Sequence, residues 1–173
     1  MNPSYNVRYA ELADAPRLAV LAAQVWMHTY ATQGVSASIA DYVLAELTPQ
    51  AFVAKLSDPA NTMLVAERDA HLLGLGVVRL NMPCASAPTA TVELSTLYVL
   101  AHYKGLGIGS RLLKDAQALA AAQARSPLWL TVNAQNLAAI NFYMHHHFQR
   151  VGTAYFVLGG VAHKNLVMLS PPG

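Results

Sequence analysis

The sequence predicts a single-domain α/β fold, a mixed and mostly antiparallel sheet of about seven strands with helices on both faces. The chain has 173 residues, 54% of them hydrophobic and only 12% charged, which is enough apolar material for one core. Strand and helix patterns alternate in the order β-α-α-α-β-β-β-α-β-α-β-β. No internal repeat or linker divides the chain, so we expect one domain over residues 1–169 and a loose tail over 170–173.

The first part of the chain predicts one strand and three helices. Residues 6–10 have strand character, and apolar side chains at helical spacing follow as far as about Tyr30. Each helix start carries an N-cap or proline signal, namely Asp14 with Pro16, the capping box Ser38–Asp41, and Thr48-Pro49.

The remainder alternates between strands and helices. Residues 68–71 are expected to turn a hairpin, and 81–90 have the composition of a loop. Because a strand–helix–strand unit brings its strands parallel, we expect parallel pairing in the second half. The expected strands cover 62–67, 72–80, 91–100, 128–132, 151–158 and 163–169, and the expected helices cover 107–125 and 137–146.

Composition excludes several classes of protein. Cys84 is the single cysteine, which excludes a disulfide framework and a multi-cysteine zinc site. The first residues lack a cationic segment followed by an apolar stretch, and no apolar run approaches the roughly 20 residues of a membrane span. No cluster of Lys and Arg is dense enough for nucleic acid. We therefore expect a cytoplasmic protein that binds neither membranes nor nucleic acid.

The charges are unevenly distributed, although the net charge is only +2. Residues 1–103 carry five basic and eight acidic side chains, a balance of −3, whereas residues 104–173 carry six and one, a balance of +5. A basic half suits an anionic ligand and an acidic half suits a cationic one. Chance is the alternative explanation.

The most informative stretch is a glycine loop, Lys104-Gly105-Leu106-Gly107-Ile108-Gly109-Ser110, between an expected strand and an expected helix. Backbone N–H groups that turn inward at the positive end of a helix dipole can hold a diphosphate. The spacing matches neither the dinucleotide fingerprint G-x-G-x-x-G nor a G-x-x-x-x-G-K-[ST] phosphate loop. A tight turn without a ligand is the structural alternative.

Two motifs resemble those of the GNAT superfamily of N-acetyltransferases. Lys104–Gly109 is similar to the acetyl-CoA loop [Q/R]-x-x-G-x-G/A, with Lys104 in place of Gln or Arg. Asn136–Phe148 resembles N-x-x-A-I-x-F-Y-x-x-x-G-F, with His147 at the usual glycine, where we expect a left-handed helix exit. The segments 25–30 and 155–160 look like the bacterial branch that includes polyamine acetyltransferases.

The resemblance implies that acetyl-CoA is the cosubstrate and that no metal is needed. It implies that backbone groups at the end of one strand bind the pantetheine arm like an added strand. It also implies that Trp26, His28 and Tyr30 lie near the acceptor, although core packing explains them equally well. The implied cofactor-binding residues are Leu97, Tyr98, Val99, Lys104, Gly105, Leu106, Gly107, Ile108, Gly109, Ser110, Asn136 and Tyr143.

Acetyl transfer to an amine needs a base, an acid and donors for the thioester oxygen. An alkylammonium has a pKa of about 10.4, so roughly one molecule in a thousand is nucleophilic near neutral pH. Glu93, a carboxylate within an apolar strand, is the candidate base and acceptor contact, with pairing to an Arg as the alternative. By resemblance, Tyr143 is the candidate acid; a half-buried aromatic is the alternative.

The predicted function is therefore transfer of acetyl from acetyl-CoA to a small cationic amine, directly in a ternary complex. Acetylation of a protein or antibiotic amine, and a silent acetyl-CoA sensor, are the alternatives. His145-His146-His147 does not suggest a metal site, because consecutive helical side chains point about 100° apart. The sequence leaves the oligomeric state open, with a homodimer as one alternative.

Overall fold

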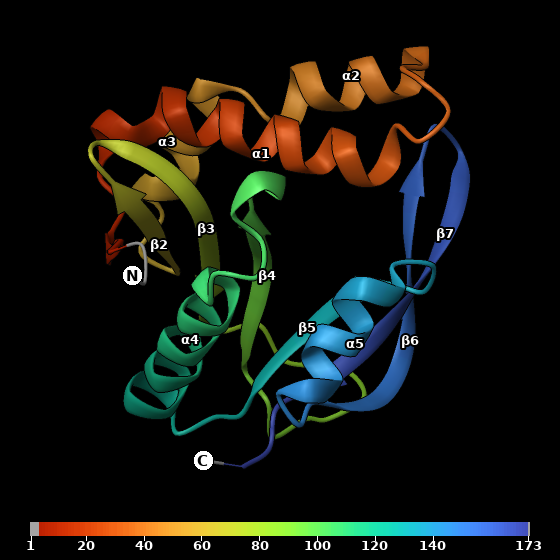
Figure 1. Cartoon of the computed structure of the whole chain (residues 1–173). Helices are drawn as coiled ribbons and strands as arrows, with labels where there is room; N and C mark the ends of the chain where they lie inside the picture. Colours follow the sequence, from red (N-terminus) through yellow and green to blue (C-terminus); the bar gives the residue numbers. More distant parts are fainter. Residues whose placement is uncertain (1–3, 173) are drawn as a thin grey trace. The chain divides into compact units, whose positions relative to one another are not determined.

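The computed structural model describes residues 4–172 and contains one seven-stranded sheet of order β1-β2-β3-β4-β5-β7-β6 (Figure 1). The predicted order of strands and helices is confirmed. Residues 1–3, where the predicted domain starts, and residue 173, where the predicted tail ends, lie outside the described residues. The elements are β1 (Asn6–Tyr9), η1 (Leu12–Asp14), α1 (Ala15–Tyr30), α2 (Ala37–Glu46), α3 (Pro49–Ser57), β2 (Asn61–Arg68), β3 (His71–Arg79), β4 (Val92–Val99), η2 (Ala101–Tyr103), α4 (Ile108–Ala124), β5 (Leu128–Asn133), α5 (Leu137–His145), β6 (Gln149–Leu158) and β7 (Val161–Leu169).

Some predicted boundaries are wrong. The N-cap of α2 is Ser36, not Ser38, because Ser36 has an extended backbone and its hydroxyl accepts the N–H of Ile39. Strand β6 begins at Gln149, two residues earlier than predicted, because that residue already pairs with Leu169. The two short 3₁₀ helices, η1 and η2, were not predicted.

The prediction of parallel pairing holds for one pair of strands. β4 and β5 are parallel, with Val92 opposite Leu128. The same prediction is wrong for β5 and β6, because β7 lies between them and is antiparallel to both. β1 and β2 are also antiparallel.

The described residues group into two compact units. The first contains the chain up to Val77 together with Thr96–Leu113, and the second contains Val78–Ser95 and the chain from Lys114 onward. In the first unit, α1 and α3 pack on β2 and β3 (Figure 1). The buried members of this core are Ala15, Leu18, Ala19, Leu21, Ala22, Phe52, Met63, Val65, Leu72, Leu75 and Val77.

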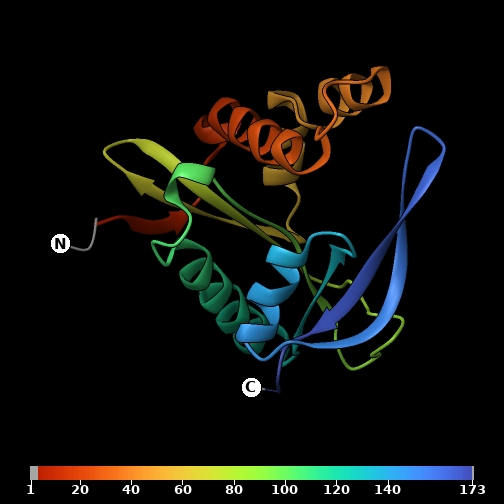
Figure 2. The same ribbon diagram turned by 45° about the vertical axis from the view of Figure 1, so that its right-hand side comes forward.

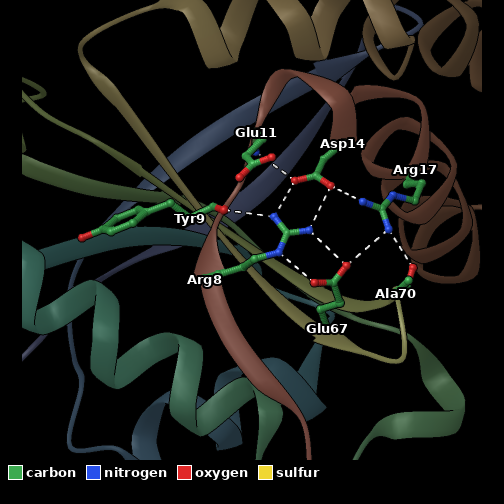
Figure 3. Close-up of polar contacts among 7 residues, drawn as sticks. All are labelled: Arg8, Tyr9, Glu11, Asp14, Arg17, Glu67 and Ala70. Atoms are coloured by element: carbon green, nitrogen blue, oxygen red, sulfur yellow. Dashed lines mark hydrogen bonds and ion pairs between the residues drawn. The ribbon is translucent and has the colours of Figure 1, made fainter.

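A network of ion pairs ties β1 to the start of α1 and to the end of β2 (Figure 3). The Arg8 guanidinium donates to Asp14 at 2.7 Å and to Glu67 at 2.8 Å. Arg17 pairs with the same two carboxylates. The Asp14 side chain, only 2% exposed, also accepts the N–H of Glu11 at 2.8 Å. The network therefore holds a four-residue edge strand that has few backbone bonds of its own.

In the second unit, β6 and β7 form one long twisted hairpin (Figure 2). The loop before β4 is held against this unit, since Trp129 Nε1 donates to the carbonyl of Met82 at 2.7 Å. Cys84 is buried in that loop and contacts the side chains of a small cluster around Val167. Ser170 is also buried, and its hydroxyl accepts the N–H of Leu128, whereas Pro171 is exposed.

Candidate active site

The glycine loop lies between η2 and α4 and contains two left-handed residues. Gly105 has φ +81° and Gly107 has φ +79°, a conformation that side chains other than glycine rarely adopt. Gly109 already belongs to the first turn of α4. Two of the three predicted glycines are therefore required by the backbone of the loop.

The start of α4 is fixed by a close approach to β3. A Cβ on Gly74 would lie 2.9 Å from the carbonyl oxygen of Tyr98, 3.1 Å from Ile108 and 3.2 Å from Leu112. Only glycine fits at this place in the strand. Gly74 was not predicted from the sequence, although a glycine inside the apolar run 72–78 is a signal for such a close approach.

The loop has room for a diphosphate. A Cβ on Gly105 would meet nothing within 4 Å, and one on Gly107 would meet a single atom, the hydroxyl oxygen of Tyr5 at 3.9 Å. The chemistry of the loop fits the group as well, because the N-terminal N–H groups of α4 have no acceptor within the helix. Lys104 is exposed beside them, while the side chain of Ile108 is fully buried, so Ile108 can offer only its backbone.

The strand that leads to the loop carries the residues expected to bind pantetheine. Leu97, Tyr98 and Val99 are the last residues of β4, and each is partly buried. Beyond them, the N–H of Leu100 donates to the carbonyl of Leu73 at 3.0 Å, so the end of β4 is held to β3.

Glu93 lies on β4 within the second unit and pairs with Arg79 at 3.5 Å. Its side chain is 14% exposed, and this burial raises the pKa of the carboxyl, while the charge of Arg79 acts in the opposite direction. The pairing with Arg that the sequence left as an alternative is thus present. A single long contact with a half-exposed guanidinium still leaves the carboxylate able to accept a proton.

Tyr143 lies on α5 within the second unit and is almost fully buried. Its ring contacts Phe142 edge-on, with centroids 5.3 Å apart, and Phe148 at 5.6 Å. Burial raises the pKa of the Tyr143 phenol well above its ordinary value, so the phenol keeps its proton near neutral pH. Unlike Glu93, it has no charged group among the causes of its shift.

Both ends of α5 follow the resemblance motif. The side-chain oxygen of Asn136 accepts the N–H of Ala139 at 3.1 Å, so Asn136 caps the helix. The expected left-handed exit is confirmed at His147, which has φ +64°. The three neighbouring histidines end the helix, and residues 4–172 contain no group of three or more ligand side chains that could hold a metal ion.

The three residues expected near the acceptor lie at the end of α1 and differ in their burial. Trp26 is 3% exposed, and its ring contacts two phenol rings, with centroids 4.6 Å from Tyr30 and 4.5 Å from Tyr42. The indole of Trp26 therefore has little exposed surface in this structure. His28 is exposed, while Tyr30 lines a cavity of about 340 Å³, which is also lined by Thr32, Gln33, Gly34, Val35, Ser36 and Ile39.

The structure thus divides the predicted residues between its units. The glycine loop, Leu97–Val99 and the acceptor-side aromatics belong to the first unit, and Glu93, Asn136 and Tyr143 belong to the second. No helix among the described residues is long and apolar enough to cross a membrane.

Comparisons with known proteins agree on one family. Residues 24–148 match the family described as "Acetyltransferase (GNAT) family". An uncharacterized N-acetyltransferase of Mycobacterium tuberculosis is 31% identical over 158 residues, which cover 91% of this chain and 97% of that protein.

Solved structures share the fold at lower identity. The PaiA N-acetyltransferase of Thermoplasma acidophilum in complex with coenzyme A has a TM-score of 0.72 and 21% identity, covering 94% of this chain and 98% of that one. The ribosomal-protein-alanine N-acetyltransferase of Brucella melitensis has a TM-score of 0.70 and 23% identity, covering 95% and 98%. The chain therefore belongs to the GNAT family of acetyltransferases and is an N-acetyltransferase of that family.

Proposed function

We propose that the enzyme transfers the acetyl group of acetyl-CoA to the primary amine of a small cationic acceptor, directly in a ternary complex. The observation that carries the proposal is the glycine loop at the start of α4, where Gly105 and Gly107 leave room for a diphosphate beside the helix N-terminus. Residues 1–169 would form the acetyltransferase domain, with Leu97–Val99 holding the pantetheine arm and Lys104–Ser110 the diphosphate.

Acetyl-CoA supplies an activated acyl group, and the side chains manage the protons. Glu93 accepts a proton from the ammonium, directly or through water, because burial raises the pKa of its carboxyl towards that of a useful base. The amine nitrogen then bonds to the thioester carbonyl carbon and the carbon–sulfur bond breaks. Tyr143 donates its proton to the departing sulfur, giving a thiol, and the extra proton on the attacking nitrogen passes to the Tyr143 phenolate, directly or through water, leaving a neutral amide.

The small cationic acceptor rests on charge. The first 103 residues have a balance of −3, and they contain both Glu93 and the cavity lined in part by Tyr30. Attraction between unlike charges weakens with salt, so the acceptor KM should rise as ionic strength rises. A polyamine would be such an acceptor, in keeping with the resemblance of residues 25–30 and 155–160.

Release of free thiol from acetyl-CoA tests the reaction class. We expect thiol to appear when an amine is added and to be absent without one. Diamines and polyamines should give higher kcat/KM than neutral amines, peptide N-termini or aminoglycosides. Binding of acetyl-CoA without thiol release for any amine would favour the silent sensor, and a preference for peptides or aminoglycosides would favour those acceptors.

A glycine variant tests the loop. Gly107→Val places a branched side chain where the diphosphate approaches and should weaken CoA at least tenfold, about 1.4 kcal/mol. Gly160→Val is the matched control, because Gly160 has φ +77° and equally open space but lies in the β6–β7 turn. Unchanged CoA affinity of a folded Gly107→Val variant in calorimetry would contradict the assignment.

A further inference from the structure

Tyr5 lies directly against the glycine loop. Its hydroxyl oxygen is the one atom within 4 Å of a Cβ placed on Gly107, at 3.9 Å, whereas the corresponding space at Gly105 is empty. With φ at +79°, Gly107 has a backbone conformation that residues with a side chain rarely adopt, so this space is left free of a side chain from the loop itself. The phenol therefore borders the space that glycine leaves open.

The position of Tyr5 is fixed by the strand that follows it. Strand β1 begins at the next residue, Asn6, which pairs with Glu67 of β2. Arg8 bonds Glu67 and Asp14 at the same time, so the edge strand is held by side chains as well as by its backbone. Tyr5 is thus presented to the loop by a strand anchored on two sides, all within the first unit.

The hydroxyl of Tyr5 can act as a hydrogen-bond donor. A phenol carries one O–H donor, and within residues 4–172 no hydrogen bond to this hydroxyl is formed. A hydrogen bond from a neutral donor to a phosphate oxygen is charge-assisted and stronger than one to a neutral acceptor. A donor of this kind next to a loop that exposes backbone N–H groups suits an anion with several oxygens.

We propose that the Tyr5 hydroxyl donates a hydrogen bond to the diphosphate of bound acetyl-CoA. The diphosphate would then lie between the Tyr5 phenol on one side and the backbone of Gly107 on the other. This inference rests on the proposed function, because it takes the glycine loop as the diphosphate site. It adds a residue from the start of the chain, outside residues 24–148 that match the family. The ion-pair network around Arg8 then serves cofactor binding by holding β1 in place.

The test compares two tyrosines and two acetyl donors. Tyr5→Phe removes one oxygen, and Tyr9→Phe is the matched control, because Tyr9 ends β1, the strand that begins just after Tyr5, and is 60% exposed. We expect Tyr5→Phe to weaken acetyl-CoA binding by about tenfold or more in calorimetry, as loss of a bond to a charged group predicts, and Tyr9→Phe to change it less than about twofold.

The second donor, S-acetylpantetheine, lacks the diphosphate. With it, the KM of Tyr5→Phe should equal that of the parent enzyme, because the group that Tyr5 contacts is absent. An unchanged acetyl-CoA affinity in Tyr5→Phe would overturn the inference, as would an equal loss in Tyr9→Phe or an equal rise in KM for S-acetylpantetheine. Failure of the parent enzyme to bind acetyl-CoA would instead overturn the proposed function.

Discussion

Two buried carboxylates, Asp14 in the first unit and Glu93 in the second, differ in the number of cations around them. Asp14 is shared by Arg8 and Arg17 and accepts a backbone N–H as well. Glu93 has one guanidinium, Arg79, at 3.5 Å. Their side chains are 2% and 14% exposed, so both have lost most of their water.

The pKa values of the two carboxyls shift in opposite directions. The hydrogen bond from Arg8 lowers the pKa of Asp14 to about 2, whereas burial raises the pKa of Glu93 above its ordinary value. Burial alone therefore does not determine the state of a carboxylate; the donors and cations around it do. Asp14 is held ionised and serves stability, while Glu93 is left able to take up a proton.

The largest expected effect comes from breaking the ion-pair network around Asp14. Asp14→Asn leaves Arg8 and Arg17 without a buried counter-charge and should lower the free energy of unfolding by about 3 kcal/mol. Asp69→Asn, in the turn between β2 and β3, is the control, because asparagine tolerates the positive φ of that residue. Urea unfolding measures both, and a loss below about 1 kcal/mol in Asp14→Asn would show that Glu67 suffices for both arginines.

The next effect concerns Tyr143, a buried acid whose pKa is raised by burial and not shifted by a cation. Tyr143→Phe removes the proton donor with little change in shape, so kcat should fall between about tenfold and a thousandfold, with the KM for acetyl-CoA little changed. Tyr155→Phe, on an exposed part of β6, should leave both constants unchanged. If kcat of Tyr143→Phe stays within twofold of the parent, Tyr143 is a packing residue.

Acid should weaken the fold through Asp14. Because its pKa is lower in the folded protein than the ordinary 3.8, the ionised form stabilises the fold above about pH 4, and this contribution is lost as pH falls towards 2. The loss should be about 2 kcal/mol. Unfolding free energies measured across this range should fall less steeply in Asp14→Asn than in the parent; parallel curves would contradict the role of Asp14.

The smallest expected effect concerns the single cation beside Glu93. Arg79→Gln removes the charge that lowers the pKa of Glu93, so that pKa should rise further. If Glu93 must be ionised to act as base, the acid limb of kcat/KM against pH moves to higher pH, by about one unit or less. Arg150→Gln, an exposed residue of β6, is the control. A limb that stays in place or moves to lower pH would separate Arg79 from the chemistry.

The sequence predicted the elements well because their signals are local. Helix starts such as Thr48-Pro49 depend on residues within one turn, and the structure has Thr48 as the N-cap of α3. The glycine loop was predicted from spacing alone, and its two positive φ values follow from the same pattern. The error at Ser38 arose because two serines lie two residues apart: Ser36 is the N-cap, whereas Ser38 already belongs to the first turn of α2.

Contacts between distant residues could not be predicted in this way. Arg8 and Glu67 are 59 residues apart, and only the pairing of β1 with β2 brings them together. The same holds for Gly74 against Tyr98, and for Tyr5 beside Gly107. The stacking of Tyr42 on Trp26 depends on how α2 packs, and the sequence periodicity of α1 does not reveal that packing.

Glu93 has fewer cations around it than Asp14. The pH dependence of the Glu93→Gln variant tests most directly whether Glu93 is the base. The kcat/KM for a small amine is measured from about pH 6 to about pH 10 in the parent and the variant. We expect the variant to lose most activity near neutral pH and to recover at higher pH, where the free amine becomes abundant. A variant whose profile runs parallel to that of the parent would contradict the role of Glu93 as base.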